Sequence, residues 1–107
     1  FILTGTDKVS IRLTNRVSFL SGVATARRNY ILNTGYNGQE KFLIIKSYSG
    51  AGNEPKIWVK TKQNDNTIFT ASKEGQVLHL ISDGTYWYPL NGISTAGTND
   101  PGDWTTN

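Results

Sequence analysis

Short runs of β-branched and aromatic residues follow one another along the chain, and clusters of Gly, Asn, Asp and Ser separate them. In the first run Val9, Ile11 and Leu13 alternate with polar residues, which is typical of a strand with one face in water. Further runs follow at 17–20, 29–32, 41–46, 56–60, 67–70, 76–82 and 85–90. Many short strands at close intervals are the pattern of an all-β sandwich or barrel. The sequence therefore predicts an all-β fold, an antiparallel β-sandwich of jelly-roll form.

The length of the chain, 107 residues, fits a single domain. We expect the β-sandwich to occupy residues 1–92, after which the composition is polar and rich in Gly, Thr and Asn. Residues 93–107 are accordingly predicted to form a C-terminal tail or linker. Trp104 interrupts this segment, either as an anchor in a groove of this chain or of a neighbour, or as an exposed side chain. Because the chain begins at Phe1 and contains no Met, we expect a processed product or a piece of a longer polypeptide.

A hairpin is predicted where Asp83 and Gly84 lie between two apolar runs. Asp-Gly in this setting favours a two-residue type I′ turn, in which both central residues have positive φ. The turn pairs Leu80 with Trp87 across the hairpin. Trp87 then shares a sheet face with Leu78 and Leu80, so we predict that Trp87 is mostly buried.

Two of the predicted strands, 42–45 and 77–81, carry large apolar side chains on both faces. A sheet of a sandwich packs one face on the core and turns the other to water. Monomeric proteins seldom expose contiguous apolar patches larger than a few hundred Å². We therefore expect the second face to be covered by another copy, so that the chain forms a homo-oligomer.

A catalytic or metal site lacks most of its usual residues in this sequence. The chain contains no Cys and a single His, His79, which lies within a predicted strand. HExxH, GxSxG and Gly-rich phosphate-loop motifs do not occur. Residues 64–66 and 99–100 offer side-chain oxygens, but without the spacing of a calcium loop. We predict no catalytic residue, no metal and no cofactor, and hence that the protein is not an enzyme.

Charge and hydropathy restrict the partners of the chain. The formal net charge is +3, yet the basic residues are scattered and only Arg27 and Arg28 are adjacent. Nucleic-acid-binding surfaces usually cluster such residues, so no specific nucleic-acid partner is expected. The longest apolar run, 42–45, is far shorter than the roughly 20 residues of a membrane span. We therefore expect no membrane span.

Aromatic residues provide the main candidates for contact with a ligand or another subunit. Tyr86, Trp87 and Tyr88 are consecutive, and Trp58 lies on the strand face opposite its apolar neighbours. Aromatic side chains on a sheet can stack on sugars, but Trp and Tyr are also enriched at protein interfaces. Both interpretations remain open for Trp58, Tyr86, Tyr88 and Trp104.

The segment from Glu74 to Leu90, EGQVLHLISDGTYWYPL, resembles a pattern common in viral surface and appendage proteins. In phage tail-fibre and large-DNA-virus particle proteins, Gly-Gln, an apolar strand and Ser-Asp-Gly-x-x-Trp-Tyr close a small β-domain. Those proteins also have a strand like 41–46, a Gly-rich turn and a strand like 57–59 upstream. The chain keeps this order over residues 29–90.

The resemblance implies a structural or adhesive module of the virion, as part of a fibre, spike or capsid decoration. It implies a homotrimer as the assembly, with other virion proteins and a host glycan or receptor as partners. No catalytic residue is implied. The alternative from another class is a non-viral carbohydrate-binding module with surface aromatics, and a small hydrolase is a distant third.

Overall fold

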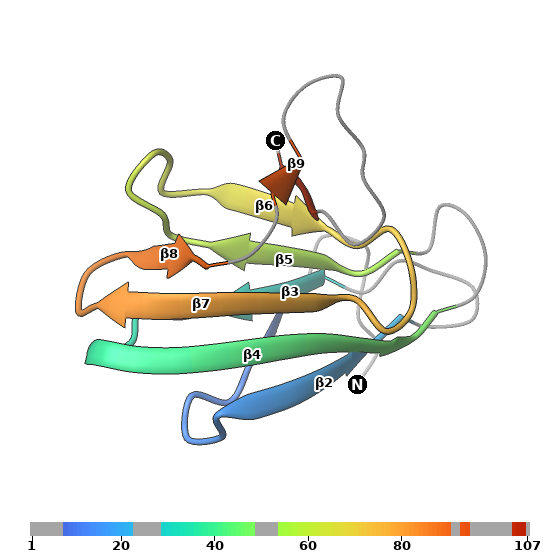
Figure 1. The fold of residues 1–107 in the computed structure, drawn as a ribbon, viewed down its shortest axis with the longest axis horizontal. Coiled ribbons are helices and arrows are strands. Elements are labelled where there is room, and N and C mark those ends of the chain that lie inside the picture. The colour runs from blue at the N-terminus through green and yellow to red at the C-terminus, as the bar shows by residue number, and fades with distance from the viewer. Residues whose placement is uncertain (1–7, 23–28, 49–53, 91–92, 95–103, 107) are drawn as a thin grey trace.

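The computed structural model describes residues 8–22, 29–48, 54–90, 93–94 and 104–106, which form ten strands and no helix (Figure 1). The six-stranded sheet has the order β1-β3-β5-β6-β10-β9, with β1 (Lys8–Ser10), β3 (Asn29–Leu32), β5 (Lys56–Val59), β6 (Thr67–Thr70), β10 (Trp104–Thr106) and β9 (Ile93–Ser94). The four-stranded sheet has the order β2-β4-β7-β8, with β2 (Val17–Ser21), β4 (Asn37–Ser47), β7 (Val77–Asp83) and β8 (Trp87–Pro89).

The two sheets pack face to face around one apolar core, which confirms the predicted all-β sandwich. Burial alternates with period two along β4 and β7, because successive side chains of a strand point to opposite faces. The core combines inward side chains of both sheets, among them Leu43, Ile45, Leu78, Leu80, Ile57, Val59 and Phe69. Full burial of one such side chain contributes roughly 1.5–3 kcal/mol.

Both sheets are mixed, which differs from the purely antiparallel, jelly-roll-like pairing predicted from the sequence. β1 and β3, β3 and β5, and β2 and β4 are parallel neighbours. From β1 to β5 the chain alternates between the two sheets. Each time the chain returns to a sheet, the new strand lies beside the previous strand of that sheet and runs in the same direction. The antiparallel pairs involve the later strands, such as β5 with β6 and β7 with β8.

The predicted hairpin is present, but its register and turn type differ from the prediction. Ser82 pairs with Trp87, so the loop contains Gly84 and Thr85 rather than Asp83 and Gly84. Gly84 has φ +97° and no non-glycine described residue has positive φ, which excludes the type I′ turn and fits type II′. The Asp83 carboxylate accepts hydrogen bonds from the amides of Thr85 (2.8 Å) and Tyr86 (2.7 Å). The side chain of Asp83 thus accepts hydrogen bonds from the turn amides, while its backbone remains part of β7.

Trp87 is fully buried, as predicted, because the new register preserves its face. Its indole nitrogen donates a hydrogen bond to the carbonyl oxygen of Asn33 at 2.9 Å. The ring lies so close to Gly35 that a Cβ there would be 2.6 Å from Cζ2 of Trp87 and 2.4 Å from Oε1 of Gln39. Position 35 therefore requires glycine, because any side chain there would clash with Trp87 and Gln39.

The described part of the segment predicted as a tail, 93–107, belongs to the sandwich. β10 pairs with β6 and with β9 in the six-stranded sheet. Trp104 is fully buried, its indole nitrogen donates to the Val77 carbonyl at 2.8 Å, and its ring packs edge-on against Phe69. The sequence left open whether Trp104 is an anchor or an exposed side chain, and the structure shows that it is an anchor in the core of this chain.

Lys41 lies on the inner face of β4 and is fully buried, which no sequence pattern indicated. Its ammonium group donates hydrogen bonds to the carbonyl oxygen of Arg12 (2.6 Å), the hydroxyl of Ser18 (2.8 Å) and the carbonyl oxygen of Asn15. Burial lowers the pKa of Lys41 below its ordinary range. The lysine therefore ties the segment between β1 and β2 to the edge of the core.

Candidate functional site

The outer face of the four-stranded sheet is an apolar surface, here called the outer sheet face. Val17, Phe42 and His79 form one cross-strand row, and Phe19, Ile44 and Val77 form the next. Residues paired in this way project from the same side of a sheet. The apolar members of the face are Val17, Phe19, Phe42, Ile44, Val77, Ile81 and Leu90.

Several of these side chains are strongly exposed. Phe19 is 64% exposed, Leu90 52% and Val17 40%. Leu90 follows β8, and its amide donates to the His79 carbonyl at 2.8 Å, which continues the ladder across the sheet. The two-sided apolar pattern of 42–45 and 77–81 is thus observed, with one set in the core and the other on this face.

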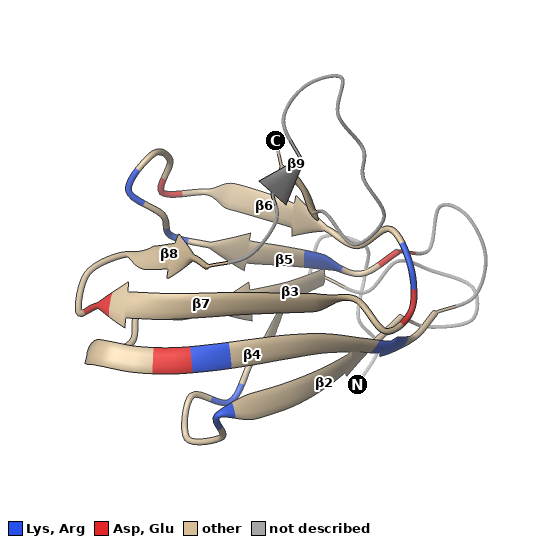
Figure 2. Ribbon diagram, in the orientation of Figure 1, with Lys and Arg blue, Asp and Glu red and all other residues tan. Residues whose placement is uncertain are grey.

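A polar trio of Arg16, Glu40 and His79 lies among the apolar side chains. Nε2 of His79 is 2.9 Å from Oε2 of Glu40, and the guanidinium of Arg16 pairs with the other oxygen of the same carboxylate. The His79 ring is stacked on Phe42, with centroids 4.0 Å apart and an interplanar angle of 13°. The hydrogen bonds from His79 and then Arg16 lower the pKa of Glu40. In Figure 2 other charged positions are sparse along β2, β4 and β7.

The trio was missed at the sequence level, although a signal for part of it exists. Glu40, Phe42 and Ile44 alternate along one face of β4, and His79 lies in an alternating position on β7. Their shared face follows from this period of two, but their pairing depends on the register between β4 and β7. Arg16 precedes β2, whose place beside β4 no local pattern indicates.

The trio resembles part of an acid–base arrangement, since an imidazole contacts a carboxylate. The ring of His79 is covered on one side by Phe42, and Arg16 shares the Glu40 carboxylate. Among the described residues no group of three His, Asp or Glu side chains is arranged to hold a metal ion. No helix in the described part of the chain is long and apolar enough to span a membrane. Absence of enzymatic activity stays a prediction.

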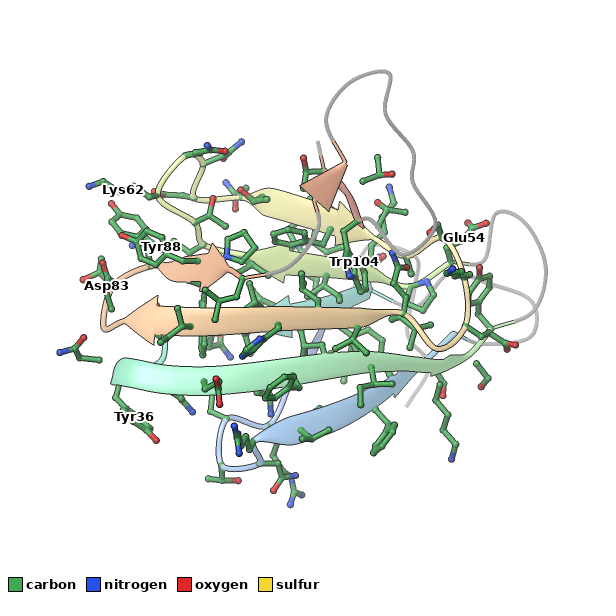
Figure 3. The ribbon with its side chains drawn as sticks, viewed as in Figure 1. Tyr36, Glu54, Lys62, Asp83, Tyr88 and Trp104 are labelled. Carbon is green, nitrogen blue, oxygen red and sulfur yellow. The ribbon has the colours of Figure 1, made fainter. Side chains whose placement is uncertain are left out.

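A second feature, here called the Tyr86 cluster, comprises Tyr86, Lys60 and Lys62. The ammonium nitrogens of Lys60 and Lys62 lie 5.3 and 5.0 Å from the centroid of the Tyr86 ring. The amide of Trp87 donates to the Lys60 carbonyl at 2.9 Å, which brings the start of β8 beside the end of β5. Figure 3 shows Lys62 and Asp83 at this same end of the sandwich.

The other predicted contact residues do not join this cluster into one platform. Trp58 lies half-buried on the outer face of the six-stranded sheet, with the Lys8 ammonium 4.8 Å from its ring. Tyr88 is on the outer side of the other sheet, where its hydroxyl donates to Asp83 at 2.9 Å. This bond raises the pKa of Tyr88 and helps to lower that of Asp83. Trp104 has no exposed surface to offer a ligand.

Comparisons with family models, with curated proteins and with solved structures find no match to this chain. The resemblance to viral particle proteins therefore depends on the sequence motif alone. The outer sheet face and the Tyr86 cluster are the features from which its function is inferred.

Proposed function

We propose that this chain is a structural module of a virus particle that self-assembles through the outer sheet face. The observation that carries the proposal is the exposure of apolar side chains there, above all of Phe19 at 64%. Because contiguous apolar surface is costly in water, such faces are usually covered by a partner. The sequence motif at Glu74–Leu90 supports a virion location, in a fibre, spike or capsid decoration.

A second copy of the chain is the partner that fits the face best. The same patch carries a cation, Arg16, and an anion, Glu40, whose side chains are 68% and 33% exposed. A surface with both signs can meet another copy without placing like charges together, and electrostatic complementarity of this kind favours specific association. The face permits a dimer or a larger ring. The viral resemblance supports a trimer, which is the assembly that we propose.

Light scattering on the purified chain tests the assembly. We expect the mass of a trimer at micromolar concentration, and dissociation when Phe19→Asp places a charge on the outer sheet face. Tyr36→Asp is the matched control, since Tyr36 is an aromatic side chain 70% exposed in the loop before β4. A wild-type monomer contradicts self-assembly. A dimer keeps self-assembly and contradicts the trimer.

The viral part of the proposal is tested on the gene that encodes the chain. Flanking collagen-like, coiled-coil or β-helical segments would place the module in a fibre. Particle genes beside it without such segments would favour a capsid decoration. A setting without any particle gene contradicts the virion location, whatever the assembly state.

A second candidate function, binding of carbohydrate, is favoured by the Tyr86 cluster. The Tyr86 ring is half-buried, and the two ammonium groups over this ring favour saccharides with carboxylate or sulfate groups. A glycan array that includes neutral and acidic saccharides tests this function. We expect salt-sensitive binding that Tyr86→Ala abolishes and Tyr36→Ala keeps. Absence of binding to every glycan contradicts it.

A further inference from the structure

The single histidine of the chain lies at the centre of the face proposed for assembly. His79 is flanked in its cross-strand row by Phe42 on β4 and by Leu90 beyond β8. Its side chain retains 24% exposure and that of Glu40 33%, so both still contact water in the isolated chain. A partner that covers Phe19 and Leu90 would remove much of this solvent. Any charge on His79 would then be buried with the interface.

We propose that protonation of His79 dissociates the assembly formed through the outer sheet face. This inference rests on the self-assembly proposed above and adds its regulation. Histidine is the side chain whose charge ordinarily changes between about pH 5 and 8. The assembly is therefore stable at neutral to alkaline pH and is lost in mild acid.

The charges of the trio give the direction of the effect. With His79 neutral, the positive charge of Arg16 and the negative charge of Glu40 cancel, and the interface buries no net charge. Protonation leaves Glu40 to balance two cations, so each copy buries one uncompensated positive charge. In the separated chain water solvates that charge, whereas in the interface its desolvation opposes binding. Protonation therefore favours the separated chains.

The groups that face His79 from the neighbouring strands support this assignment. Glu40 and Phe42 face it from β4, Arg16 precedes β2, and Tyr88 and Leu90 lie on the β8 side. The Tyr88 hydroxyl is bonded to Asp83, whose carboxylate also accepts two turn amides. The pKa of Glu40 is lowered by His79 and Arg16, so this carboxylate stays ionised in mild acid. The change of charge that the proposal invokes is therefore assigned to the imidazole and not to the Glu40 carboxylate.

Linkage sets the expected size of the effect. We assume that each copy must release one proton to associate. At pH values where the imidazole of the separated chain is mostly protonated, lowering the pH by one unit then reduces the association constant by about tenfold for each copy. Light scattering of the full chain at pH 8 and pH 5, at one ionic strength, measures the change. We expect the wild type to be assembled at pH 8 and monomeric at pH 5. Near-UV circular dichroism at both pH values shows that the monomer is folded.

Variants test the role of His79 independently of pH. His79→Gln, which stays neutral, is expected to assemble at both pH values, whereas His79→Arg, with a permanent charge, is expected to be monomeric at pH 8. Gln63→Lys is the matched control, because it adds the same charge at an exposed loop position and is expected to assemble at pH 8. Assembly of the wild type in acid, or of His79→Arg at pH 8, overturns the inference and leaves self-assembly intact. A wild-type monomer at pH 8 refutes self-assembly and the inference with it.

Discussion

Replacement of the buried Lys41 by Met is the sharpest test of how the core is held together. Met has nearly the length and shape of the lysine stem, so little cavity is expected. The change removes the donor for the carbonyls of Arg12 and Asn15 and for the hydroxyl of Ser18. The perturbation is thus confined to the polar contacts of one ammonium group.

The expected cost follows from those contacts. Two backbone carbonyls left without a partner cost roughly 1–3 kcal/mol each. Removal of the buried ammonium group reduces this cost in part, because burial of a charge is itself unfavourable. We therefore expect Lys41→Met to lower the free energy of unfolding by about 2–4 kcal/mol, a large part of the roughly 5–15 kcal/mol typical of a domain.

Urea unfolding followed by tryptophan fluorescence measures this difference from the midpoint and slope. All variants are compared at one protein concentration, since association contributes to apparent stability. Lys46→Met is the matched control, because Lys46 is exposed on the same strand and its replacement should change stability by less than about 0.5 kcal/mol. A Lys41→Met variant as stable as the wild type would contradict this estimate and show that the desolvation of the ammonium group cancels the three contacts.

The pH dependence of stability gives an independent readout for Lys41. Its folded-state pKa is lowered by burial, so between that value and the ordinary 10.5 the unfolded chain binds more protons than the folded chain. Stability therefore rises with pH in this window. We expect the wild type to gain stability relative to Lys41→Met as the pH is raised toward 10.5.

Three further predictions concern local structure. Gly35→Ala should destabilise the chain by about 1–3 kcal/mol in urea unfolding, because its methyl group would overlap the Trp87 ring; unchanged stability would contradict this packing. Trp104→Ala should cost about 3–5 kcal/mol by the same assay, whereas an exposed tail residue would cost almost nothing. Because folding lowers the pKa of Asp83, this carboxylate stabilises the folded chain at pH values above its ordinary pKa of 3.8. That stability is lost as the pH falls through the pKa of the folded state. The melting temperature should therefore drop more between pH 6 and pH 3 for the wild type than for Asp83→Asn, and equal drops would count against these hydrogen bonds.

The amino-acid sequence by itself determined the local features of the fold. Alternation with period two identifies strands and the face of each strand, and it placed Trp87 in the core. It also showed that 42–45 and 77–81 are apolar on both sides, and these segments form the core and the outer sheet face. Such features are readable because successive side chains of a strand point in opposite directions whatever the strand pairs with.

Only the tertiary structure decided which strands are neighbours. Strand 17–21 lies parallel to β4 because the chain crosses between the sheets, and the same crossings make β3 and β5 parallel. The hairpin loop consists of Gly84 and Thr85, and the Asp83 side chain accepts hydrogen bonds from the amides of Thr85 and Tyr86. Strand neighbours and hairpin register involve contacts between residues distant in the chain or the hydrogen bonds of a single side chain. The period-two pattern of a strand predicts neither.

The same limit applies to the candidate sites. Exposure of Phe19 and burial of Lys41 and Trp104 depend on which sheet covers each side chain, not on its neighbours in sequence. The trio forms because β2, β4 and β7 are adjacent, and Glu40 and His79 are 39 positions apart in the chain. Strand faces follow from local sequence, whereas contacts between faces arise only when the whole chain has packed, because burial and pairing are collective properties.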